Sequence, residues 1–298
     1  LPDVFLRKLM RNIEIKDRLS LRLTCHAFEN LVANSHAGHF EAAFISSFTP
    51  DKLHLVLGNT SFYGIEWSNE VIEQRLLLMN SLFINISIGE FDFNIDDNFT
   101  AVSFVRDLIS NFKIGTVGFR VDSKCQLDNS LLIMSDFLNS NYTMDLCFLP
   151  ETEQLLSLPP MEELCIFTRS KISSELFIKL LDMHKNLDLG YLIINSDDLM
   201  TAVRTVSADT RQREIRLKVE RSGIVSCLRD YGVSEDSKPG DFYDELEIVH
   251  VKKIHKLMHL RFDRCFIELK RFAWTGGDWN VDLTISNAEQ KPSLDPSI

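Results

Sequence analysis

Residues 1–32 read LPDVFLRKLMRNIEIKDRLSLRLTCHAFENLV, and no other stretch of the chain combines residue identity and spacing so specifically. Apolar side chains recur at i, i+3, i+4 and i+7 from Leu6, which is the spacing of one stripe along a helix. Pro2 stands where the first turn of a helix tolerates proline. The sequence therefore predicts a short first helix over residues 2–12.

The second half of this stretch fits two interpretations. Leu19, Leu21, Leu23 and Cys25 alternate, which is typical of a strand, but Asp17 before them favours the N-cap of a helix. On a helix, Leu19 and Leu23 would share one face, and Leu21 and Cys25 would lie on nearly the opposite one. A small element has a single core, so the second face would require a protein partner.

As a whole, the segment resembles an F-box, the helical module that docks substrate receptors onto the Skp-type adaptor of cullin–RING ubiquitin ligases. It has the leading Leu-Pro, two leucine-rich parts around a Lys-Asp turn, and a Cys followed three residues later by an aromatic. Glu14 and Phe28 replace the proline and tryptophan of many members. An ordinary amphipathic hairpin is the alternative, but it constrains only the apolar period. The resemblance implies adaptor binding by Leu1, Pro2, Leu6, Leu9, Leu19, Leu21, Leu23, Cys25 and Phe28.

The composition is that of a globular protein, with 45% hydrophobic and 25% charged residues among 298. The net charge is −11, and the acidic excess lies beyond residue 45. An acidic body disfavours nucleic acid and anionic lipid as partners. No window of about 18 apolar residues predicts a membrane span. Together with the F-box resemblance, these features lead us to expect an intracellular protein, in the cytoplasm or the nucleus.

We expect residues 1–45 to form the F-box and residues 46–82 to form a helical connector. The segment FTPDK at 48–52 favours a turn into a helix, with Thr49 as the N-cap. The run GNTSFYG that follows is typical of a loop, and a further helix is expected over 71–79.

Residues 83–286 alternate short apolar strands with helical segments, which favours parallel strands joined by crossover helices. An apolar-x-x-apolar-x-apolar submotif recurs, as it does in leucine-rich-repeat proteins, which this part resembles. The period is irregular and the closing Asn or Cys is missing, so a non-repeat α/β receptor domain stays open as the alternative. The clearest copies are 114/117/119, 161/164/166, 189/192/194, 243/246/248 and 257/260/262. Strands are expected at 83–88, 116–121, 144–148, 163–168, 189–194, 214–219, 245–249 and 260–262, and helices at 98–112, 129–139, 173–184, 197–206 and 222–231.

The end of the chain has a different pattern. Residues 266–272 and 279–285 alternate in hydrophobicity around TGGD, which has the glycines that a β-hairpin turn requires. We expect this hairpin to cover the open edge of the α/β array. Residues 287–298 are expected to be a disordered tail.

The motifs of common enzymes and nucleotide-binding sites are absent from the sequence, so we expect a non-catalytic protein without cofactor or metal. The acidic run around Asp92 favours a solvated loop over a metal site. The basic region 249–272 fits either a solvated helix face or a site for acidic or phosphorylated segments. His255 and His259 are spaced for a helix but have no third metal ligand.

These features predict the substrate-recognition subunit of an SCF-type ubiquitin ligase, whose C-terminal domain binds a protein substrate. An α/β scaffold or recognition protein without a ligase role is the alternative. On a concave sheet, the outward strand residues would contact the substrate. These residues are Phe167, Tyr191, Ile193, Arg216, Lys218, Glu247 and Arg261.

Overall fold

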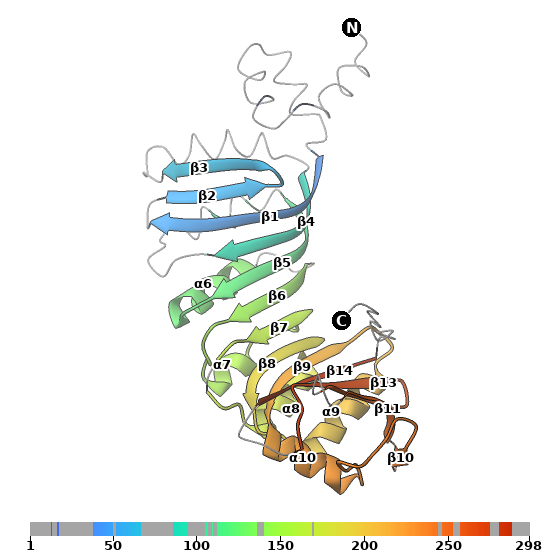
Figure 1. The fold of residues 1–298 in the computed structure, drawn as a ribbon. Coiled ribbons are helices and arrows are strands. Elements are labelled where there is room, and N and C mark those ends of the chain that lie inside the picture. Colours follow the sequence, from blue (N-terminus) through green and yellow to red (C-terminus); the bar gives the residue numbers. More distant parts are fainter. Residues whose placement is uncertain are drawn as a thin grey trace. The chain divides into compact units, whose positions relative to one another are not determined.

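The protein is described here by a computed structural model, and the part of the chain that it describes combines the α-helices α6 to α10 with β-strands (Figure 1). This mixture confirms the predicted α/β class. The residues divide into two compact units between Met144 and Asp145, within strand β6 (Asn141–Leu146). The structure describes residues 13, 17, 38–49, 52–66, 86–94, 105–106, 109, 112–135, 140–168, 170–243, 246–252, 257–274 and 280–287.

In the first unit, five strands follow the order β5-β4-β1-β2-β3. The first three strands of the chain form an antiparallel meander, whereas β4 and β5 run parallel to β1. Helix α6 starts after Ser123, whose hydroxyl accepts a hydrogen bond from the backbone N–H of Gln126. The elements are β1 (Gly38–Thr49), β2 (Lys52–Leu57), β3 (Thr60–Glu66), β4 (Ile86–Asn94), β5 (Lys113–Val121) and α6 (Lys124–Met134).

The helical connector predicted for 46–82 is wrong over its described part, which lies in the strands β1, β2 and β3 and the turn between the last two. Residues that the predicted boundary assigned to the F-box, 40–45, belong to β1. Leu55 and Leu57 are fully buried opposite Ile45 and Ala43, so cross-strand packing outweighs the helix-start signal of FTPDK. The helix predicted for 71–79 lies outside the described residues.

The parallel strands share the apolar submotif found in the sequence. In β5, Ile114, Val117 and Phe119 are all buried. The copies 161/164/166 and 189/192/194 are buried as well. In each copy the two residues between the first and the second apolar position are not buried. The submotif therefore marks a break in the alternation of buried and exposed residues along the strand. Leucine-rich-repeat character stays a prediction.

In the second unit, the strand order is β10-β11-β12-β13-β14-β9-β8-β7. Strands β7, β8 and β9 are parallel and alternate with helices, as predicted, and the other pairs are antiparallel. The elements are α7 (Thr152–Leu156), β7 (Glu163–Ile166), α8 (Ser174–Met183), β8 (Asn186–Leu192), α9 (Ser196–Ala208), β9 (Glu214–Glu220), α10 (Arg221–Asp230), β10 (Phe242–Tyr243), β11 (Leu246–Lys252), β12 (Leu257–Phe262), β13 (Cys265–Lys270) and β14 (Asn280–Ser286).

The last two copies of the submotif, at 243/246/248 and 257/260/262, are not repeat units. They lie in β10 to β12, which form an antiparallel meander with β13. Their short spacing leaves no room for the crossover that parallel strands need. The predicted C-terminal hairpin is confirmed as the β13–β14 pair, and β14 covers the edge of β9, the last parallel strand.

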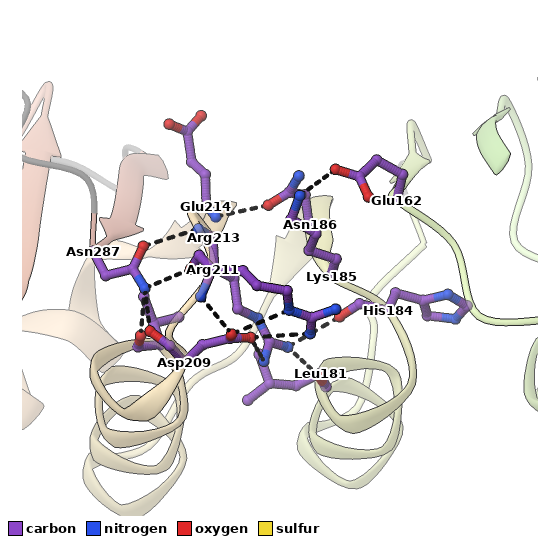
Figure 2. Close-up of polar contacts among 11 residues, drawn as sticks. Glu162, Leu181, His184, Lys185, Asn186, Asp209, Arg211, Arg213, Glu214 and Asn287 are labelled. Carbon is purple, nitrogen blue, oxygen red and sulfur yellow. Dashed lines mark hydrogen bonds and ion pairs between the residues drawn. The ribbon is translucent and has the colours of Figure 1, made fainter. Parts of the chain in front are cut away.

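A buried polar network joins β9 to the C-terminal end of α8 (Figure 2). The side chain of Arg213, just before β9, is 6% exposed. Its guanidinium donates to the carbonyl oxygens of Leu181 and His184, the latter at 3.0 Å, and lies 3.6 Å from the carboxylate of Asp209. The last carbonyls of a helix have no partner within it, so Arg213 satisfies these acceptors.

Asn287 has the same role at the C-terminal end of α9 (Figure 2). Its amide nitrogen donates to the carbonyl oxygens of Val206 at 3.1 Å and Asp209 at 2.8 Å. Its amide oxygen accepts from the backbone N–H of Arg213 at 2.9 Å. The network therefore ties β14, β9, α8 and α9 together, and the predicted disordered tail cannot begin at 287. Residues 288–298 lie outside the described residues.

The close approach of β4 to β1 generates a first prediction. A Cβ added to Gly89 would lie 2.6 Å from the carbonyl oxygen of Glu41, which is backbone and cannot rotate away. Gly89→Ala should therefore lower the free energy of unfolding by about 2 kcal/mol in urea titrations. The neighbouring exposed Glu90→Ala should change it by less than about 0.5 kcal/mol. Equal effects of the two substitutions would contradict this packing.

A second prediction concerns pH. His184 is 2% exposed, and burial, followed by the charge of Arg213, lowers its pKa to about 4. The unfolded chain takes up this proton near pH 6.5, so stability is full above 6.5 and falls as the pH drops towards 4, by up to about 3 kcal/mol. His184→Phe should remove this part of the pH dependence in urea titrations between pH 7.5 and 5. Parallel curves for variant and wild type would exclude it.

Candidate protein-binding surface

The nine residues predicted to bind the adaptor lie outside the described residues. Within residues 1–32 the structure describes Ile13, which is half-buried, and Asp17, which is exposed. The adaptor-binding residues therefore stay predictions. They are Leu1, Pro2, Leu6, Leu9, Leu19, Leu21, Leu23, Cys25 and Phe28.

The surface that the structure does describe lies on one face of the sheet in the second unit. On β9, Ile215, Leu217 and Val219 are buried, whereas Arg216 and Lys218 between them are exposed. Helices α8 to α10 pack against strands of this sheet, and successive strand residues point to opposite faces (Figure 1). The exposed side, which we call the polar face, therefore lies opposite the helices.

Acidic side chains gather on the polar face at β7, β8 and β9. The guanidinium of Arg216 forms ion pairs with Glu163, with Asp188 at 3.4 Å and with Glu214 at 3.3 Å. Burial raises the pKa of Asp188, and the negative charges of Glu163 and Asp145 add to this rise against the cations nearby. One arginine thus faces three carboxylates, and the local charge is not balanced by Arg216 alone.

Cations and anions are matched more closely at the other end of the polar face. Arg261 of β12 pairs with Glu247 of β11. Glu268 of β13 lies 2.9 Å from the ring nitrogen of His259 and 2.6 Å from the ammonium group of Lys270. The Arg261–Glu247 pair joins two strands, and such cross-strand pairs between opposite charges stabilise a sheet modestly.

These pairs correct the interpretation of the basic region 249–272. The described part of this region forms strands and not a helix: His259 lies in β12, and His255 lies outside the described residues. Arg271 is also paired, 3.6 Å from Asp282. Cations already matched by carboxylates within the same sheet are poor anchors for a phosphorylated segment.

Exposed apolar side chains cluster where β7 and β8 end. Phe167 is 53% exposed, Tyr191 38% and Ile193 44%. The register shifts here, because Leu189 pairs with Leu217 but Leu192 pairs with Val219. Strand β8 therefore contains one extra residue, as in a β-bulge.

The bulge places Tyr191 in an unusual backbone conformation. Its φ is +55°, which a bulky side chain adopts rarely and at a cost of about 1 to 2 kcal/mol. The next residue, Leu192, returns to the buried face. The bulge therefore exposes an aromatic ring without interrupting the core, and Gly190 beside it lies against the backbone of residues 166–168.

The structure thus places all the predicted substrate-binding residues in the second unit. Arg216, Lys218, Glu247 and Arg261 share the polar face, where Glu247 and Arg261 are paired with each other. The acidic partners of Arg216 were not predicted from the sequence. These partners are Glu163, Asp188 and Glu214. The feature that could have identified them is their negative charge at outward positions of neighbouring strands.

The described residues contain no group of three or more His, Cys, Asp or Glu side chains that could hold a metal ion. No helix in this part of the chain is long and apolar enough to cross a membrane. Cys165 is 7% exposed, and burial together with Asp145 and other carboxylates raises the pKa of its thiol far above the ordinary range. Such a thiol stays protonated and is a poor nucleophile.

A comparison with known protein families finds a match in the N-terminal segment. The model of the F-box domain matches residues 1–39. The match confirms the resemblance found in the sequence and contains all nine predicted adaptor-binding residues. No curated protein and no solved structure matches the chain.

The strained conformation of Tyr191 yields a third prediction. Because glycine adopts a positive φ without penalty, Tyr191→Gly should be more stable than Tyr191→Ala by about 1 kcal/mol in urea titrations. On the regular strand β9 the order should reverse, with Lys218→Gly less stable than Lys218→Ala by about 0.5 to 1 kcal/mol. The same order at both positions would argue against the bulge.

Proposed function

We propose that this chain is an F-box protein that serves as the substrate-recognition subunit of an SCF-type ubiquitin ligase. F-box domains bind Skp-type adaptors of cullin–RING ligases. The match over residues 1–39 is the observation that carries the proposal. In this role the F-box binds the adaptor, the second unit holds a protein substrate, and the complex works inside the cell.

The proposed mechanism needs no catalytic residue in this chain. A receptor accelerates ubiquitin transfer by raising the effective concentration of the substrate near the loaded conjugating enzyme. The protonated thiol of Cys165 and the paired charges of the polar face fit a binding role. We further propose that the parallel strands with the shared submotif are leucine-rich-repeat-like units, which would present outward residues side by side.

The polar face supports the second half of the proposal. It combines exposed aromatic and aliphatic side chains with charged residues held by neighbours, which is the composition of specific protein interfaces. Because a bound partner must complement this arrangement of charges, the polar face favours specificity more than raw affinity.

A fourth prediction tests the adaptor contact. We expect Leu1→Ala/Pro2→Ala to reduce retention of the co-expressed Skp-type adaptor in a pull-down by about tenfold or more, because both residues belong to the predicted docking surface. Arg7→Ala/Lys8→Ala, a matched pair outside that surface, should retain the adaptor like the wild type.

Equal retention by both double variants, or no retention by the wild type, would overturn the adaptor contact. A second experiment, a reconstituted ubiquitylation reaction, distinguishes the ligase role from that of a scaffold. The complex of chain and adaptor is combined with cullin, RING subunit, activating and conjugating enzymes, and ubiquitin conjugates are followed on bound proteins. Adaptor binding without cullin recruitment or conjugates would favour a recognition or scaffold protein.

A further inference from the structure

The exposed apolar cluster on the second unit sits beside a surplus of negative charge. Phe167 follows Cys165 by two residues on the chain, and its backbone N–H donates to the carbonyl oxygen of Leu146 at 2.7 Å. Residues two apart on an extended chain point to the same side, about 7 Å apart. The ring of Phe167 therefore lies on the same side as the thiol of Cys165.

Cys165 is flanked by acidic side chains on both neighbouring strands. It pairs with Asp188 of β8, and its thiol is hydrogen-bonded to the side chain of Asp145 of β6. We call the exposed side chains of Phe167, Tyr191 and Ile193 the apolar cluster. Asp145 and Asp188 lie level with Cys165, two residues before Phe167 along the strand direction.

The charge of this region is negative. Asp145, Glu163, Asp188 and Glu214 surround it, whereas the cations near Asp188 are Arg216 and Lys218. Arg216 is already shared among three of the carboxylates. A ligand that supplies one or two positive charges would complete the pairing, and an acidic or phosphorylated ligand would add repulsion.

We propose that the apolar cluster, with Asp145 and Asp188 beside it, binds an extended segment of the protein substrate that carries an apolar side chain and a lysine or arginine two residues away. The apolar side chain packs on Phe167, Tyr191 and Ile193. The basic side chain, about 7 Å along the segment, reaches the two aspartates. This inference rests on the proposed function for the identity of the ligand as a substrate, and on the polar face for its chemistry.

The spacing follows from the strand geometry. The segment needs the same two-residue step that separates Phe167 from Cys165, so an extended peptide with alternating apolar and basic residues matches both subsites at once. The apolar contact supplies affinity, and the aspartates select the sign of the flanking charge.

The fifth prediction uses three fluorescein-labelled peptides of equal length. One alternates Lys and Leu, one has every Lys replaced by Glu, and one has every Leu replaced by Ser. Binding to the full chain, co-expressed with the Skp-type adaptor, is followed by fluorescence anisotropy. We expect the Lys-Leu peptide to bind about tenfold or more tightly than either analogue, and its Kd to rise with salt.

Substitutions locate the site. Phe167→Ser/Tyr191→Ala and Asp145→Asn/Asp188→Asn should each weaken the Lys-Leu peptide by about tenfold. Two matched variants should bind like the wild type: Phe242→Ala, an aromatic 66% exposed on β10, and Asp236→Asn, an exposed carboxylate on a turn of the same unit. Thermal melting of each variant shows that it is folded.

The proposal is overturned if the acidic peptide binds as well as the basic one, or if folded cluster variants bind the Lys-Leu peptide like the wild type. An adaptor pull-down on the same samples keeps the two ideas apart. Adaptor binding with no preference among peptides refutes the substrate chemistry alone. Selective peptide binding by a chain that retains no adaptor refutes the proposed ligase role alone.

Discussion

The second unit depends on a buried arginine placed where two helices end. Arg213 donates hydrogen bonds to carbonyl oxygens at the end of α8 and lies beside Asp209 at the end of α9. Asn287 donates to the last carbonyl oxygens of α9. A buried charge whose partner is lost costs about 3 to 5 kcal/mol, so these contacts hold only in one arrangement of strand and helices. They fix where β9 starts relative to the helix layer, and with it which residues of β9 point outwards.

That arrangement separates the two faces of the sheet. Ile215, Leu217 and Val219 turn to the helices, and their burial supplies the apolar contribution to stability. Arg216 and Lys218 turn to the opposite side, where the neighbouring strands add carboxylates. The same alternation that builds the core therefore builds the polar face. The bulge at Tyr191 interrupts it at one point and adds an aromatic ring to a charged surface.

The proposed division of labour between the two ends of the chain agrees with their chemistry. The F-box segment is rich in leucine and matches a family by identity and spacing. The polar face carries exposed apolar side chains at the ends of β7 and β8 and, at β10, Phe242, within a field of charges. The leucine-rich F-box segment fits the proposed contact with an adaptor that a whole family shares. The polar face fits the proposed selection of one ligand, because charge arrangement discriminates between partners more sharply than apolar area does.

The sequence by itself determined the F-box, because there the identities and spacings of residues near in the chain carry the signal. It also determined most strands and helices between 113 and 231, where apolar periodicity and capping residues agree with the packing. Only the tertiary structure decided that 38–49, 52–57 and 60–66 are strands, since the burial of Leu55 and Leu57 against β1 outweighs a local helix signal. It also decided that β11 to β14 run antiparallel, and that Glu163, Asp188 and Glu214 meet at Arg216. Those contacts join residues distant in sequence, and no local pattern records which strands become neighbours.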